Sequence, residues 1–191
     1  IQYSTVVFLF AHPDDESMFF LPTIFGLIQQ QQQQQNQQNN PQKNANDSLS
    51  IMTTIVFLCL SNGNYHGLGE IRKQELYRLV NYIQHKQQSS SSKVNYMVHV
   101  IDHRELPDSP NQRWSPIVIA NVLQQVLLSL RHPDDNLVDL YTFDRYGISG
   151  HVNHVDTRYG LQRFLMTLEP QNNNPIKFRA FQLVTISKLK S

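Results

Sequence analysis

The sequence predicts an α/β fold, built as a single-domain, Rossmann-like, mainly parallel sheet flanked by helices. The chain has 191 residues, of which 40% are hydrophobic, enough for one sizeable core and too few to expect two. Apolar, β-branched runs alternate with segments of helical period, which is the pattern of repeated strand-helix units. Polar clusters follow these apolar runs, at the positions where open parallel sheets bind ligands.

The expected strands and helices follow from the spacing of the apolar residues. Strands are expected at residues 4–11, 53–60, 96–101, 137–143 and 178–186. Helices are expected at residues 14–28, 70–84, 116–130 and 155–168. Pro13 and the acidic residues that follow it favour a helix N-terminus at the start of the first helix. Pro22, inside this helix, is expected to kink it or to end it early.

Two polar tracts interrupt this pattern. Residues 29–40 are all Gln or Asn, and mostly polar residues continue to Ser50. Such a composition buries too little apolar surface to offset its ordering entropy, so residues 29–50 are expected to form a disordered insertion. Residues 87–92 are expected to form a second polar loop. Residues 1–191 therefore form one predicted domain with two insertions.

Composition excludes several classes of protein. A formal net charge of +1 without a dense block of Lys or Arg gives no sign of a nucleic-acid partner. The single cysteine, Cys59, cannot form an internal disulfide and is expected to be a buried, inert thiol, which fits a reducing compartment. No apolar stretch reaches the roughly 18 residues of a transmembrane helix. The chain begins with Ile1 rather than Met, so we expect that a signal, an anchor helix or a few residues preceded it.

The polar clusters are expected to meet at one edge of the sheet. Residues 12–16, 61–69, 102–108 and 144–154 each follow one of the expected strands. The carboxyl ends of parallel strands share an edge, so four segments that are remote in sequence should converge there. Residues 132–135 repeat the His-Pro-Asp-Asp of the first cluster but precede a strand, which predicts a simple turn at the opposite edge.

The first cluster combines an imidazole with crowded carboxylates, which indicates a metal site. His12 and Asp15 lie three residues apart across a strand-to-helix turn and can face one point. With a later imidazole they would supply two His and one Asp, leaving one position open, as in catalytic zinc sites. Asp14 projects differently and is free to act as a general base. His154 is favoured as the third ligand, and His151 as an acid or oxyanion stabiliser.

Two other interpretations of these residues stay open. Glu16 could be the base, although stabilising the helix N-terminus or supporting a ligand is the favoured role. The cluster could also be an acid-rich helix cap, which would explain Asp14 or Asp15 but not His12. The two later imidazoles could be ordinary surface side chains.

With these residues the chain resembles the phosphatidylinositol N-acetylglucosamine de-N-acetylases. This family is the eukaryotic branch of a superfamily that includes bacterial sugar deacetylases of the mycothiol and bacillithiol pathways. The resemblance spans nearly the whole chain outside the polar tracts. It rests on Ala11-His12-Pro13-Asp14-Asp15-Glu16, on Ser61-Asn62-Gly63-Asn64 with Gly67-Leu68-Gly69, Arg72 and Glu75-Leu76, and on Thr142-Phe143-Asp144 with Gly147, Ser149-Gly150-His151 and Asn153-His154.

The resemblance implies an LmbE-like deacetylase fold and a zinc-dependent amidohydrolase. Its substrate would be N-acetylglucosaminyl-phosphatidylinositol, which is deacetylated in the second step of glycosylphosphatidylinositol anchor synthesis. His12, Asp15 and His154 would bind zinc or another divalent metal. Asp14 would be the general base, and His151 would assist the transition state.

The resemblance also implies that Arg72 and Asp108 contact the sugar. For Arg72 the alternative is a salt bridge to Glu75 on the same helix face, and for Asp108 it is a turn after Pro107. Supporting roles in the loops and around the ligands are implied for Asn64, Asp144 and Asn153.

Location and partners follow from the same resemblance. Eukaryotic members act at the cytoplasmic face of the endoplasmic reticulum membrane, usually behind an N-terminal membrane helix, which would precede Ile1. A glycolipid substrate predicts an exposed apolar rim near the site. The candidates for this rim are Tyr65, Leu68, Trp114 and Ile148.

Two competing functions are considered. The first is a soluble deacetylase acting on a different N-acetylglucosaminide. The second is a non-catalytic scaffold that uses the Gln/Asn tract for association, although a scaffold has no need for a free carboxylate beside a metal.

Overall fold

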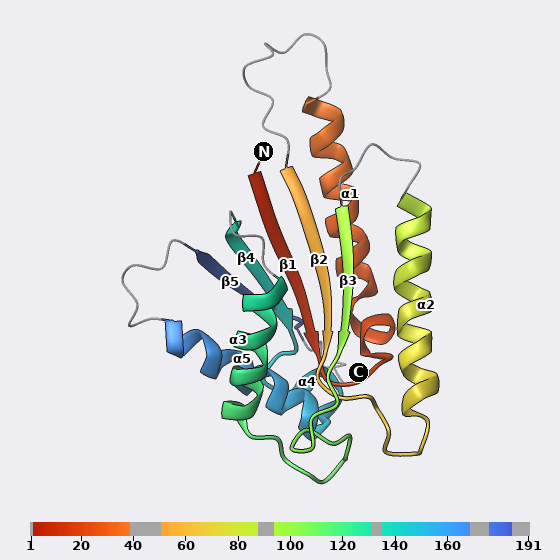
Figure 1. Cartoon of the computed structure of the whole chain (residues 1–191), viewed down its shortest axis with the longest axis vertical. Helices are drawn as coiled ribbons and strands as arrows, with labels where there is room; N and C mark the ends of the chain where they lie inside the picture. The colour runs from red at the N-terminus through yellow and green to blue at the C-terminus, as the bar shows by residue number, and fades with distance from the viewer. Residues whose placement is uncertain (1, 39–50, 88–93, 131–134, 169–175, 185–191) are drawn as a thin grey trace, which may run out of the picture.

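A parallel sheet forms the centre of the molecule. The computed structural model describes residues 2–38, 51–87, 94–130, 135–168 and 176–184. Within them, five strands pair in the order β3-β2-β1-β4-β5, and every pair is parallel (Figure 1). The strands are β1 (Gln2–Phe10), β2 (Ile51–Cys59), β3 (Val94–Val100), β4 (Asp135–Thr142) and β5 (Lys177–Gln182). The predicted α/β class is confirmed, and each predicted strand overlaps an observed one, although β5 ends at Gln182 and not at residue 186.

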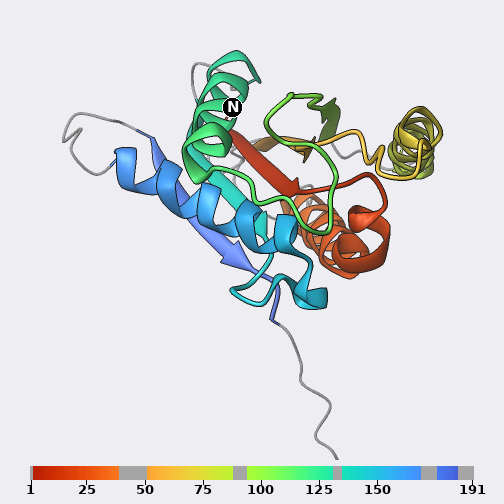
Figure 2. The same ribbon diagram turned by 90° about the horizontal axis from the view of Figure 1, so that it is seen from below.

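The helices cover both faces of the sheet. They are η1 (Glu16–Phe20), α1 (Leu21–Gln38), α2 (Gly69–Gln87), α3 (Pro116–Leu130), α4 (Gly147–Gly150) and α5 (Val152–Leu168). Seen from below, α1 and α2 lie on one side of the sheet and α3 and α5 on the other (Figure 2). The chain crosses from β3 back past β1 to β4, so the order of the strands reverses beside β1. Ligand sites of open α/β sheets lie at such a switch point.

The core explains why β1 is an unbroken apolar run. From Val7 to Ala11 every residue is fully buried, because helices cover both faces of this central strand. Phe8 and Phe10 pack against Phe20 of η1, with ring centroids 5.9 and 6.1 Å apart. The first turn after β1 is thereby fixed to the sheet.

The first helix differs from its prediction. It begins as a π-helical turn, continues as α1 past Pro22 and ends at Gln38. Proline has no N–H to donate to the carbonyl four residues earlier, and a wider turn before it accommodates that missing bond. The helix therefore does not end at Pro22.

The disorder expected for residues 29–40 is wrong as far as Gln38, because these residues extend α1. Glutamine is a good helix former, so a run of it can propagate a helix that is already nucleated and packed. The Gln31 side chain also accepts a hydrogen bond from the Thr53 hydroxyl at 2.9 Å. Residues 39–50 and 88–92, the rest of the predicted insertion and most of the predicted loop, lie outside the described residues.

The repeated His-Pro-Asp-Asp lies almost wholly outside the described residues, which omit 131–134. Its last residue, Asp135, begins β4 and pairs with Tyr3 near the start of β1. That is the amino end of the sheet, opposite the edge at which the first cluster lies.

Candidate active site

The predicted site residues meet in one pocket. It has a volume of about 370 Å³ and lies beyond the carboxyl ends of the strands. Segments following β1, β2, β3 and β4 all contribute to its lining, as expected for clusters placed after parallel strands. Its lining includes every residue predicted for the site, namely His12, Asp14, Asp15, Arg72, Asp108, His151 and His154.

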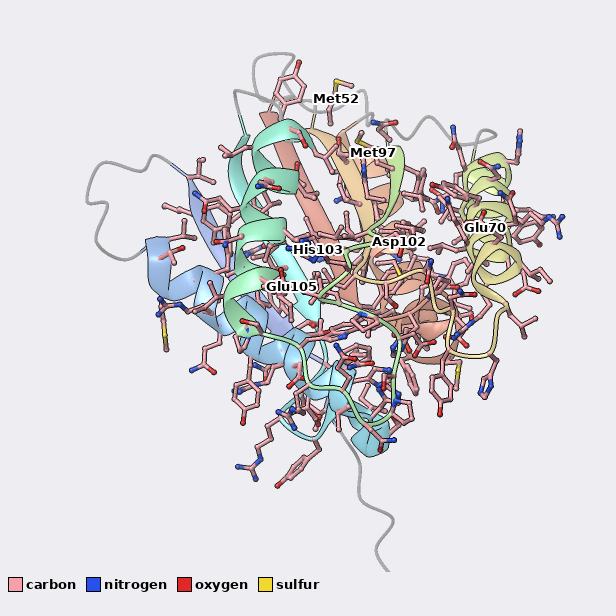
Figure 3. All side chains as sticks on the ribbon, turned by 60° about the horizontal axis from the view of Figure 1, so that its bottom comes forward. Met52, Glu70, Met97, Asp102, His103 and Glu105 are labelled. Carbon is pink, nitrogen blue, oxygen red and sulfur yellow. The ribbon has the colours of Figure 1, made fainter. Side chains whose placement is uncertain are left out.

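Not every polar residue after β3 takes part. Figure 3 turns this end of the molecule forward and labels Asp102, His103 and Glu105 on the segment that leaves β3. These three residues do not line the pocket, whereas Asp108 does. The predicted cluster at 102–108 is therefore reduced to its last member.

Asp15 links the backbone after β1 to an imidazole on α5. One carboxylate oxygen accepts the backbone N–H groups of Ala11 and His12, at 3.1 and 2.8 Å, and the other lies 3.1 Å from His154 Nε2. Burial alone would raise the pKa of Asp15, but the hydrogen bond and charge of His154, together with His12, outweigh it and lower the pKa. Asp15 is therefore a buried carboxylate held in its ionised form.

His154 is oriented by its other ring nitrogen. Nδ1 lies 3.0 Å from the carbonyl oxygen of Gly147 and 3.1 Å from the hydroxyl of Ser149, so Nε2 faces Asp15. The ring also stacks on Phe143, with centroids 4.2 Å apart. Burial lowers the pKa of His154, but the Asp15 carboxylate outweighs this and raises it. A ring plane fixed through Nδ1 to a backbone carbonyl is typical of metal-binding histidines.

His12 faces the same space from the end of β1. Burial lowers its pKa, against the opposing effect of Asp15 and Asp108. The neutral imidazole that this favours is the form that binds metals. Its Nε2 lies 3.2 Å from Asp108 and 3.3 Å from the Asn153 side-chain oxygen.

The donor set fits a divalent cation. Among the described residues, His12, His151 and His154 can each present a nitrogen within 4.8 Å of the others. Asp15 adds a carboxylate oxygen 3.1 Å from His154 and another 3.7 Å from His12. Two imidazoles are thus common to both possible sets, and the third ligand is either Asp15, as predicted, or His151.

Arg72 and Asp108 are part of this arrangement. Arg72 donates to the Asp14 carboxylate at 2.6 Å, to the Gly63 carbonyl at 2.8 Å and to Asp108 at 3.3 Å. Asp108 also accepts the backbone N–H of Tyr65 at 3.2 Å. Both side chains therefore bond into the pocket, which disfavours the simple salt bridge and the simple turn considered above.

Asp14 is the most accessible of the clustered carboxylates. Its side chain is 45% exposed, compared with 3% for Asp15. Burial raises the pKa of Asp14, while the charge and hydrogen bond of Arg72 oppose that rise. A carboxylate that is free of the two buried imidazoles and open to the pocket can accept a proton from water.

Other residues hold the site from behind. Asn153 is fully buried, accepts the Ser109 N–H at 3.2 Å and lies against His12. Asp156 accepts the backbone N–H of Trp114 at 2.7 Å and pairs with Arg113 at 2.6 Å. The supporting role of Asn153 followed from the resemblance, but that of Asp156 was missed. An acid two residues beyond His154 on the same helix was the available signal.

Comparison with known proteins places this pocket in context. No family model matches the chain. Over 161 residues it is 35% identical to a probable N-acetylglucosaminyl-phosphatidylinositol de-N-acetylase of Schizosaccharomyces pombe, covering 84% of this chain and 52% of the relative. It is 32% identical over 188 residues to the N-acetylglucosaminyl-phosphatidylinositol de-N-acetylase of Bos taurus, covering 98% of this chain and 59% of the relative. The chain is a homologue of these de-N-acetylases.

The same similarity extends to the Saccharomyces cerevisiae N-acetylglucosaminyl-phosphatidylinositol de-N-acetylase, at 32% identity over 144 residues and 75% of this chain. The chain spans between 38% and 59% of the length of these three de-N-acetylases. Among the described residues, no helix combines the length and the apolar character needed to cross a bilayer.

The apolar rim predicted for a glycolipid de-N-acetylase is present in part. Tyr65 and Met18 line the pocket and are 53% and 65% exposed, and Leu68, which does not line it, is 48% exposed. Trp114 is buried at 2% exposure, so it is a core residue and not part of the rim. Ile148 is partly buried and packs against the core.

Proposed function

We propose that this chain is the catalytic domain of a metal-dependent hydrolase that removes the acetyl group from N-acetylglucosaminyl-phosphatidylinositol. One observation carries the proposal: the residues predicted to be ligands, base and sugar contacts line a single pocket in a homologue of the de-N-acetylases. The reaction belongs to the synthesis of glycosylphosphatidylinositol anchors.

We assign His12, Asp15 and His154 as the residues that would hold the cation, and zinc as the metal. Asp15 is preferred to His151 because it is buried and ionised and touches His154, whereas His151 is only partly buried. A divalent cation held there would act as a Lewis acid toward water and toward a carbonyl oxygen.

The reaction is amide hydrolysis, in which the oxygen of water bonds to the acetyl carbon and the bond from carbon to nitrogen breaks. Asp14 accepts the proton that the attacking water loses. Arg72, at 2.6 Å, holds the Asp14 carboxylate toward the pocket and can also donate to a sugar hydroxyl. Asp108 accepts from the sugar on the same side.

His151 supplies the opposite side of the reaction. Its ring lies 4.9 Å from that of His12 and 5.0 Å from that of His154, and it lines the pocket. From there it can stabilise the developing negative charge or deliver a proton to the leaving nitrogen. The products are acetate and a free amino sugar.

The test is acetate release by the purified protein from the complete glycolipid, from its water-soluble headgroup and from N-acetylglucosamine. Metal-depleted protein and zinc-restored protein are assayed in parallel. Efficient release from the glycolipid alone supports the proposal. Equal release from the headgroup supports a soluble N-acetylglucosaminide deacetylase, and no release from any of them supports a scaffold.

We further propose that the chain acts at the cytoplasmic face of the endoplasmic reticulum membrane. The resemblance supports this location, and the exposed Tyr65, Leu68 and Met18 supply an apolar surface beside the pocket. Protease protection of a tagged full-length protein in intact microsomes tests it. A tag on this domain that is protected until detergent is added would place the domain in the lumen and contradict the proposal.

A further inference from the structure

The backbone of Asp14 has an unusual conformation. Its φ angle is +117°, and the only other described non-glycine residue with a positive φ is Ile148. Residues with a Cβ rarely adopt a positive φ, so the surrounding structure must enforce it. The residue proposed as the general base is therefore held away from its relaxed backbone conformation.

The Asp14 carbonyl group is fixed from the helix side. It accepts the backbone N–H groups of Ser17 and Met18, at 3.0 and 2.9 Å, and the hydroxyl of Ser17 at 2.7 Å. These bonds begin the helical turn that follows. They restrain the carbonyl side of Asp14. The φ angle describes rotation about the N–Cα bond, on the amide side, so these bonds do not fix it.

Glu16 fixes the amide side. One of its carboxylate oxygens accepts the backbone N–H of Asp14 at 2.9 Å, and the residue is buried, with 3% exposure. A buried carboxylate next to Asp14 and Asp15 is electrostatically unfavourable and needs a compensating donor. Glu16 does not line the pocket, so its side chain is placed to act on the backbone and not on a substrate.

The conformation of the backbone sets the direction of the Asp14 side chain. That side chain meets Arg72 at 2.6 Å and lines the pocket, while its neighbour Asp15 turns to His12 and His154. In an extended chain the side chains of adjacent residues also point in opposite directions. Here the side chains of Asp14 and Asp15 must instead both reach the same pocket from one tight turn. The positive φ makes that possible.

We propose that Glu16 is a positioning residue that holds the Asp14 N–H and thereby aims the Asp14 carboxylate into the pocket. This inference rests on the proposed function in one respect, namely the role of Asp14 as base. The required property of Glu16 is a hydrogen-bond acceptor at this position. Its negative charge is not required.

The test compares Glu16→Gln with Glu16→Met in the metal-loaded protein. Gln keeps an acceptor and loses the charge, whereas Met keeps a similar volume and loses the acceptor. Misplacing a catalytic group by about 1 Å can cost roughly a hundredfold in rate, so Glu16→Met should lower kcat by at least about tenfold, with KM nearly unchanged. Glu16→Gln should restore kcat to within about threefold of wild type. Zinc content should be unchanged in both.

Glu70→Gln and Glu70→Met are the matched controls. Glu70 lies in the first turn of α2, and its side chain is 79% exposed. Both substitutions there should leave kcat unchanged. Should Glu16→Met fail to fold, Glu16→Ala removes the same acceptor without overfilling the site and takes its place.

Three results would overturn the inference. Equal loss of kcat in the Gln and Met variants would show that the charge itself is needed. Wild-type kcat in the Met variant would show that the bond positions nothing. Loss of zinc would make Glu16 a support of the metal site.

Crystal structures of the same variants give a readout that does not depend on activity. In Glu16→Met the φ of Asp14 should leave the positive region and its carboxylate should move away from Arg72, whereas both should persist in Glu16→Gln. If the wild-type protein releases no acetate, the proposed function fails. The crystal structures still test whether the bond from the Asp14 N–H to Glu16 positions Asp14. An unchanged Asp14 backbone in the Met variant would contradict the inference.

Discussion

The guanidinium of Arg72 lies 2.6 Å from the carboxylate of Asp14, although 58 positions separate them in the chain. Asp14 follows β1, and Arg72 stands in the first turns of α2, which begins after the neighbouring strand β2. The sheet therefore brings the proposed base together with a cation that can orient it. The following predictions test what this arrangement does.

Asp14→Asn separates proton transfer from metal binding. The amide keeps the shape and a polar contact with Arg72 but has no basicity. We expect zinc to remain bound and turnover to fall by about a hundredfold to ten-thousandfold, the usual contribution of a general base. Zinc content, KM and acetate release are measured on one preparation. Lost zinc would instead make Asp14 a ligand, and near-normal turnover would move the base role to His151, which also lines the pocket.

The identity of the third ligand is decided by two substitutions. If Asp15 is the ligand, Asp15→Ala should lose both zinc and turnover, whereas His151→Ala should lose turnover and keep zinc. His12→Ala and His154→Ala should lose zinc in either case, because both residues belong to each possible donor set. Metal analysis after gel filtration reads this directly. Retained zinc in Asp15→Ala together with its loss in His151→Ala would reverse the assignment.

Gly63→Ala should lower turnover through Arg72. A Cβ at Gly63 would lie 2.7 Å from Arg72 Nη1 and 2.9 Å from Pro13 Cδ, so the guanidinium must move. Gly67→Ala is the control, because its φ of +74° matches the +69° of Gly63 while no atom lies within 4 Å of its added Cβ. Both variants should lose stability through the strained positive φ, and Gly63→Ala somewhat more because of the overlap, but we expect kcat to fall by about tenfold or more only in Gly63→Ala. Equal kcat in the two variants would contradict this.

The close contact of α3 with α5 predicts a stability effect remote from the pocket. A Cβ at Gly160 would overlap Ile119 Cγ2, so Gly160→Ala should destabilise the protein by about 1–3 kcal/mol, as other overpacked cores do. Combining it with Ile119→Ala should cost less than the sum of the single changes. Gly26→Ala, in α1 with open space around it, should instead stabilise by up to about 1 kcal/mol. Urea unfolding measures all four variants.

The strained backbone at Asp14 predicts that relieving the strain raises the free energy of unfolding, although activity is lost with the carboxylate. Asp14→Gly and Asp14→Ala both remove the carboxylate, but only glycine adopts a φ of +117° without strain. The Gly variant should therefore be the more stable of the two by about 1–3 kcal/mol, with both inactive. Chemical unfolding in the presence of a chelator excludes a contribution from bound metal. Equal stabilities would show that the surrounding bonds do not oppose relaxation.

The sequence was sufficient to predict the central strands because β1 and β2 each contain a continuous apolar run. Residues 4–11 and 53–60 could be recognised as strands for this reason, and polar residues after them then had to meet at one edge. The meeting of His12 with His154 in one pocket followed from that placement alone.

Other features depend on three-dimensional context that the sequence pattern lacks. Composition suggested disorder after residue 28, but the packed first half of α1 supplies a nucleus from which the Gln run can continue as helix. Pairwise contacts such as the one between Arg72 and Asp14 require the register of two elements, which periodicity does not give. The positive φ of Asp14 arises from bonds on both sides and has no glycine to signal it.

His12 follows the end of β1 and His154 lies in the first turns of α5, so 142 positions separate the two imidazoles along the chain. A cation bound by both would cross-link the chain and close a very long loop, and cross-links that close long loops are expected to add the most stability. Binding would then oppose separation of β1 from α5 and add to the free energy of unfolding in proportion to the logarithm of metal concentration. A cation held at this site would make the thermal midpoint of the whole domain a measure of metal occupancy.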